Sequence, residues 1–154
     1  MNPQALVLLL AVSTSAAAPA EHPQPPAEYA PLEGFVGNWT TLGRESQFHE
    51  VCEWYSGKFH VICNAKSKRA DGSTGHSMSI LSFVPGGGYV YSGIGSKGRY
   101  ETFSGGRWSE GTFIFELRET ENGAPVINRI VIGPFTETGF LFVVSTSDDG
   151  VSWV

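Results

Sequence analysis

The sequence predicts an all-β fold, an antiparallel up-and-down β-barrel of about ten short strands. Turn-forming residues recur from Gly43 onward, and the short segments between them are rich in aromatic and β-branched residues. Helical periodicity with caps is absent from the sequence, apart from one turn of helix at 32–36. A β-sandwich is the alternative, but its Greek-key topology needs a long connection, and none is evident after Leu32.

The turn signals divide the chain into strands in order. Dipeptides such as Asp71-Gly72 and Asn122-Gly123 mark hairpin turns, because they tolerate the backbone angles that tight turns require. The final segment is very short, so we expect either a truncated C-terminus or an imperfectly closed barrel. The expected strands are 38–43, 46–55, 59–67, 76–84, 88–94, 99–104, 107–118, 126–134, 140–147 and 151–154.

The N-terminal region predicts export. Residues 1–20 are uncharged, contain an apolar stretch and end at Ala18-Pro19-Ala20, as a signal peptide with an A-x-A cleavage site does. A membrane anchor is the alternative, although a spanning helix needs about 20 apolar residues. Residues 21–31 hold four prolines and predict a disordered or extended leader, which places the β-barrel domain at 32–154.

The charge balance argues against nucleic acid as a partner. Ten basic residues face fifteen acidic ones, for a net charge of -5, and the basic residues are scattered. Together with the signal peptide, this predicts a periplasmic or extracellular protein without a stable membrane span after cleavage.

Cys52 and Cys63 are the only cysteines, and they lie symmetrically about the pair Gly57-Lys58. This symmetry predicts a hairpin clamped by a disulfide, with Cys52 facing Cys63 and Trp54 facing Val61, all on the core side of the sheet. A two-residue loop would put the cysteines on a hydrogen-bonded pair, where the Cα atoms lie farther apart. A bulge or a longer loop would bring them closer.

A short motif carries a family resemblance. The run Phe35-Val36-Gly37-Asn38-Trp39, followed by a meander of short strands, resembles the opening of calycin-superfamily barrels, such as lipocalins and fatty-acid-binding proteins. It is most similar to small bacterial lipocalin-like domains of unknown function. The resemblance implies that Trp39 plugs one end of the barrel.

Residues 146–153 resemble an Asp-box, a hairpin motif that recurs in sialidase propellers. A single copy does not support a propeller. We expect Asp148 to accept amide hydrogen bonds in this turn, Gly150 to adopt a positive φ, and Trp153 to pack below it.

The sequence offers no catalytic, metal or cofactor site that we can name. Its four histidines show neither H-x-H nor His-Glu-x-x-His spacing, and there is no G-x-S-x-G nucleophile motif. The predicted disulfide also removes both thiols. Enzymatic activity is therefore the third functional hypothesis, after ligand binding and a role as an interaction module.

The predicted ligand-binding residues are Tyr89, Tyr91 and Arg129. The tyrosines belong to a recurrent aromatic face that forms either a solid core or the lining of a cavity. Arg129 interrupts an apolar strand, and facing inward it would need an acidic partner from protein or ligand. We expect non-covalent binding of a small apolar molecule; the alternative is a cell-envelope interaction or structural module with a packed interior.

Overall fold

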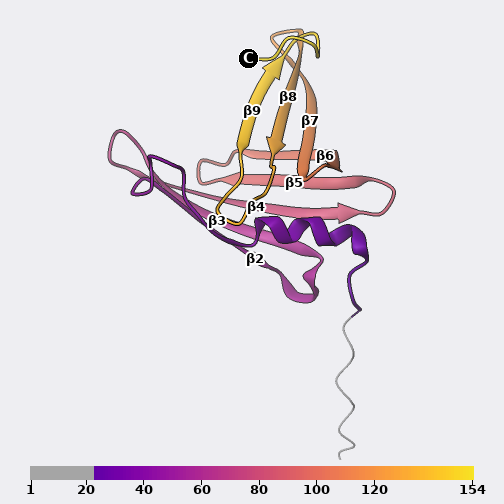
Figure 1. Ribbon diagram of the computed structural model, residues 1–154. Helices are drawn as coiled ribbons and strands as arrows, with labels where there is room; N and C mark the ends of the chain where they lie inside the picture. The colour runs from indigo at the N-terminus through magenta and orange to yellow at the C-terminus, as the bar shows by residue number, and fades with distance from the viewer. Residues whose placement is uncertain (1–22) are drawn as a thin grey trace, which may run out of the picture.

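The computed structural model describes residues 23–154, so the predicted signal peptide lies outside the described residues. Within this range nine strands form one antiparallel sheet in sequence order (Figure 1), and the predicted all-β class is confirmed. The elements are η1 (Ala27–Phe35), β1 (Gly37–Trp39), β2 (Phe48–Trp54), η2 (Ser56–Lys58), β3 (His60–Lys68), β4 (Thr74–Val84), β5 (Gly88–Gly95), β6 (Tyr100–Ser109), β7 (Thr112–Glu121), β8 (Ala124–Ile132) and β9 (Phe142–Ser147).

The sheet is open, with β1 and β9 as its edges. The expected tenth strand at 151–154 does not form; instead Thr146 and Val154 exchange two backbone hydrogen bonds of 2.9 and 3.0 Å. β7, β8 and β9 rise away from the layer formed by β2–β5 (Figure 1). The closed barrel expected from the turn lengths is therefore not what the described residues form.

β6 makes the corner between these two parts of the sheet. Its pairing with β5 extends to Gly106, and its pairing with β7 begins at Arg107. A Cβ atom on Gly106 would lie 2.5 Å from the ring of Phe115, so this position accepts no side chain. Gly105 has a φ of 69°, which glycine adopts without steric cost. Two adjacent glycines thus allow the strand to turn.

η1 covers one face of the sheet, which we call the interior face (Figure 1). Leu32 is fully buried there, and the Tyr29 ring lies 5.3 Å from Phe59 and 5.5 Å from Phe83 in edge-to-face contacts. The Tyr29 hydroxyl donates to the Phe83 carbonyl at 2.9 Å. The sequence predicts a disordered or extended leader at residues 27–31, but they form the first half of η1. They are ordered because the Tyr29 ring packs against Phe59 and Phe83.

The connection between β8 and β9 packs against η1 and β1. Phe140 lies 4.9 Å from the Trp39 ring, and Phe135 lies 5.0 Å from Phe35. The Trp39 indole donates to the Phe35 carbonyl at 2.6 Å. This aromatic cluster joins the two ends of the sheet through side chains, and Trp39 packs partly buried against the core. None of the helices in residues 23–154 has the length and apolar character needed to cross a bilayer.

The clamped hairpin forms with the predicted register. Cys52 pairs with Cys63, Trp54 pairs with Val61, and both cysteines are buried in a disulfide. The loop is longer than two residues, because the Tyr55 amide donates to the His60 carbonyl at 2.8 Å. Counting back from this hydrogen-bonded pair puts the cysteines at a non-hydrogen-bonded pair, where strands approach most closely. Their Cα atoms are 4.0 Å apart, so the longer loop resolves the geometric difficulty.

Replacing both cysteines by alanine should lower the free energy of unfolding by about 2 to 3 kcal/mol, because the unfolded chain then loses the constraint of a closed loop. Urea denaturation of the oxidised protein and of the Cys52→Ala/Cys63→Ala variant measures this difference. Equal stability of the two proteins would show that the clamp contributes nothing.

Candidate functional site

The register arranges the interior face into cross-strand rows of contrasting size. One row is bulky, and it runs from Trp54 on β2 through Val61, Leu81 and Tyr91 to Phe103 on β6. The next two rows, which both lie on the same side of the bulky row, contain mostly small side chains. They are Cys52, Cys63, Ser79, Gly93 and Glu101, and then Glu50, Ala65, Ser77 and Gly95.

These small rows leave an open pocket of about 180 Å³ on the interior face. Ser77, Ser79, Gly93 and Gly95 make its floor because none of them carries a large side chain. The charged or aromatic groups around this floor come from three strands and one turn. The complete lining is Glu50, Ser77, Met78, Ser79, Tyr91, Gly93, Ile94, Gly95, Arg99 and Glu101.

Glu50 is the one half-buried carboxylate in this lining that lacks a protein partner. Among the described residues, no hydrogen bond or ion pair reaches its side chain. Burial raises its pKa above the usual range, because removal from water penalises the charged form. One carboxylate oxygen lies within 4.8 Å of both disulfide sulfur atoms. The disulfide-bonded sulfurs are not thiolates, so this trio does not form a metal site.

Tyr91 stands at the boundary between the bulky row and the pocket. Its ring lies 5.9 Å from Phe115 and 6.4 Å from Phe142, with tilted geometry in both pairs. Burial raises the pKa of its hydroxyl, and a hydrogen bond with Ser79 opposes that shift. Tyr91 therefore offers an aromatic surface and a polar group to the same space.

The rim of the pocket carries an internal ion pair. The guanidinium of Arg99, in the turn before β6, donates to the carboxylate of Glu101. The Arg99 side chain is 77% exposed, so this pair belongs to the mouth and not to the floor. Because the pair neutralises itself, Glu50 determines the net charge of the pocket.

The other predicted tyrosine serves the core. Tyr89 is 7% exposed, and its hydroxyl donates to the Glu28 carbonyl of η1 at 2.7 Å. Its ring meets Phe113 edge-to-face at 4.9 Å. Tyr89 thus ties the helix to the sheet, and it does not line the pocket beside Tyr91.

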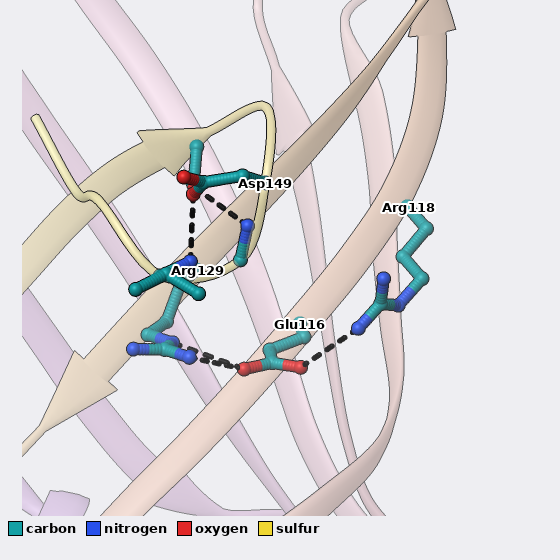
Figure 2. A network of polar contacts seen from close by, with 7 residues as sticks. Glu116, Arg118, Arg129 and Asp149 are labelled. Atoms are coloured by element: carbon teal, nitrogen blue, oxygen red, sulfur yellow. Dashed lines mark hydrogen bonds and ion pairs between the residues drawn. The ribbon is translucent and has the colours of Figure 1, made fainter.

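Arg129 lies on the opposite face of the sheet from Tyr91, where it pairs with Glu116 (Figure 2) and also contacts Trp153. Its guanidinium donates to Glu116 at 3.0 and 2.6 Å, and it lies 3.4 Å from the centre of the Trp153 ring. The second oxygen of Glu116 lies 3.9 Å from Arg118. Arg129 therefore does not face inward, which was the condition for expecting a ligand there, and its acidic partner is the protein side chain of Glu116.

The Asp-box turn forms, but Asp149 and not Asp148 organises it (Figure 2). One Asp149 oxygen accepts from the Val151 amide at 2.7 Å, the Ser152 amide at 2.8 Å and the Ser147 hydroxyl at 2.9 Å. These bonds, the Ser152 amide first, lower the pKa of Asp149 to about 2. Gly150 has the predicted positive φ, at 75°. The motif spacing alone could not show which of two adjacent carboxylates faces the turn.

A second hollow, of about 190 Å³, lies at the far end of β2 and β3, where residues 45–49 face residues 66–68 and Thr74. Its walls come largely from the turn before β2 and from the ends of strands, outside the covered core. The carboxylate in its lining, Glu45, already has hydrogen-bond partners. Its own amide and the amide of Gly43 donate to it and lower its pKa, the opposite of the shift at Glu50. It is the weaker candidate.

Tyr91 is the one predicted ligand-binding residue that lines this pocket, and the rest of the lining was not singled out from the sequence. Two signals were available: Glu50 interrupts the inward-facing series that includes Cys52 and Trp54, and small residues alternate at 77, 79, 93 and 95. Alternation places such residues on one face of a strand. Their meaning depends on the register between neighbouring strands, which the sequence specified only for the clamped hairpin.

Asp149→Ala should destabilise the protein near neutral pH, whereas Asp148→Ala should have little effect. The pKa of Asp149 is lower in the folded state than in the unfolded chain, so ionised Asp149 contributes to folding stability. This contribution is fully present above the ordinary pKa, about 3.9, and is lost as pH falls toward about 2. Urea denaturation of both variants across this window measures the effect. Equal destabilisation by the two substitutions would refute the assignment.

Glu50→Gln should stabilise the ligand-free protein near neutral pH. The folded-state pKa of Glu50 is raised, so stability falls as pH increases from its ordinary value to the raised one. Glutamine has no charge to desolvate and should lack this fall. The exposed Glu53 on the other face gives the matched control, Glu53→Gln. Parallel stability–pH curves for the wild type and Glu50→Gln would contradict the expectation.

No family model matches this chain, and comparison with curated proteins and with solved structures likewise finds no match. The resemblance of residues 35–39 to the calycin opening therefore stays a prediction from sequence. The function of the pocket is therefore argued from the side chains that line it.

Proposed function

We propose that this protein binds a small, largely apolar molecule non-covalently, in the pocket beside Tyr91 on the interior face of an incompletely closed, calycin-like barrel. The observation that carries this proposal is the hollow that Ser77, Ser79, Gly93 and Gly95 leave beside the bulky row of the interior face. Small side chains at four adjacent inward positions leave space that a solid core would fill. Of the three predicted ligand residues, Tyr91 is the one that lines this space.

The size of the pocket restricts the ligand. Its volume of about 180 Å³ falls below the roughly 300 Å³ at which pockets for drug-sized molecules begin. A compact ligand fits inside, and a longer one must extend along the open sheet. Phe142 is 49% exposed and lies next to Tyr91, so an apolar surface continues from the pocket toward the β9 edge.

Export forms part of the proposal. The disulfide is compatible with an oxidising compartment, where such bonds persist. A binding protein that acts outside the cytosol encounters its ligand in the periplasm or in the medium.

A cell-envelope interaction module is the second candidate, and one observation favours it. Apolar side chains at the β9 edge are exposed, with Leu141 at 64%, Val143 at 46% and Val144 at 60%. An unpaired edge strand with apolar side chains is a surface to which another polypeptide can add. This function needs no ligand in the interior pocket.

Filling the pocket tests the binding proposal. A Cβ atom on Gly93 would meet its nearest neighbour, Tyr91, at 3.7 Å, an ordinary contact, so Gly93→Val should fold while its methyl groups occupy the pocket. With benzyl alcohol as a neutral aromatic probe, we expect the dissociation constant measured by NMR titration to rise at least about tenfold, or about 1.4 kcal/mol.

The matched control is Ser92→Val, which adds similar bulk to β5 but projects toward the other face. It should bind the probe as the wild type does, and circular dichroism should show that both variants fold. If benzyl alcohol binds Gly93→Val as well as it binds the wild type, the pocket is not a ligand site and the interaction module becomes the better account.

A further inference from the structure

We propose that the ligand of this pocket is a cation, an organic ammonium on a compact apolar body, and that Glu50 is its counter-ion. This inference rests on the proposed binding function and names its ligand class. The evidence is the position of Glu50, the charge balance of the lining and the chemistry of the neighbouring groups.

Glu50 projects inward beside the disulfide, on the same face as Cys52 and Trp54. A half-buried carboxylate loses hydration, and proteins ordinarily compensate with a hydrogen bond or a cationic side chain. Residues 23–154 provide neither for Glu50, as described above. The missing partner is thus a group that reaches the pocket from solution, and its positive charge would offset the cost of burying Glu50.

The other charged groups in the lining leave this role to Glu50. Arg99 and Glu101 neutralise each other at the mouth, and Tyr91 is a neutral phenol near neutral pH. Ionised Glu50 therefore gives the pocket one uncompensated negative charge. An anionic ligand would be repelled, and the net charge of -5 on the whole chain acts in the same direction.

The remaining groups suit an ammonium better than a metal ion. Ser77 and Ser79 carry hydroxyls that can accept N–H hydrogen bonds, and the face of Tyr91 can attract a cation. Calcium requires about six to eight oxygen ligands, whereas Glu50 supplies one carboxylate. The apolar body of the ligand then lies toward Tyr91 and the two rings that Tyr91 contacts, Phe103 and Phe115.

Three probes of one shape test the inference: benzylammonium, benzyl alcohol and benzoate. With the wild type, NMR titration should show benzylammonium binding at least about tenfold more tightly than benzyl alcohol, and benzoate binding least. In Glu50→Gln the preference for the ammonium should disappear, while binding of benzyl alcohol is retained. Glu53→Gln removes the same charge from the outer face and should keep the preference.

The pH dependence gives a second readout. Benzylammonium stays charged in mildly acidic solution, so its advantage over benzyl alcohol should fall as Glu50 becomes protonated. Because burial raises the pKa of Glu50, this loss should occur at a higher pH than for an ordinary glutamate. Arg99, Glu101 and Tyr91 are the other titratable groups facing this space. Glu53→Gln, which removes a charge from the other face, should leave the midpoint of this loss largely unchanged.

The outcomes separate the two proposals. Equal binding of benzylammonium and benzyl alcohol, with both lost in Gly93→Val, would keep the ligand site and overturn the role of Glu50. A preference for the ammonium that persists in Glu50→Gln would overturn it as well. Failure of all three probes to bind the wild type would overturn the proposed function together with this inference.

Discussion

The pairing of Cys52 with Cys63 is the constraint on which the interior face depends. A slip of one residue in a strand would exchange its two faces and turn Val61 and the cysteines toward water. The disulfide prevents that slip between β2 and β3, and the meander transmits the register strand by strand to Ser79 and Gly93. The same clamp that secures the core thus positions the floor of the pocket.

An open sheet has to cover its apolar face without the strand pairing that closes a barrel. Here η1 covers one part of that face, and the β8–β9 connection covers another through Phe135 and Phe140. Both covers gather large aromatic side chains at one end of the interior. The rows of small side chains lie beyond this cluster, so packing is dense where the covers meet the sheet and the pocket remains open beside Tyr91.

The pKa values of two acidic residues, Asp149 and Glu50, shift in opposite directions, because hydrogen bonds dominate at the first and burial at the second. Asp149 is exposed, and the amides of its own turn stabilise its charge, which serves local structure. Glu50 is half-buried and partly desolvated, which disfavours its charge. Arg129 could have served as a counter-ion, but it lies on the outer face with Glu116 and Trp153. A charge without a partner on the interior face is consistent with a role in binding.

The sequence by itself determined the β class, the clamped hairpin and the inward-facing residues of β2 and β3, because alternation and turn chemistry are local properties. It also selected Tyr91 through aromatic periodicity. The tertiary structure decided that η1 begins at Ala27, that the sheet stays open, and that Arg129 pairs with Glu116. It also brought Glu50 beside Ser77 and Gly93. These outcomes depend on the register between strands, on how the sheet bends and on which segments cover it. Such contacts join residues distant in the chain, and the local pattern of a single strand does not specify them.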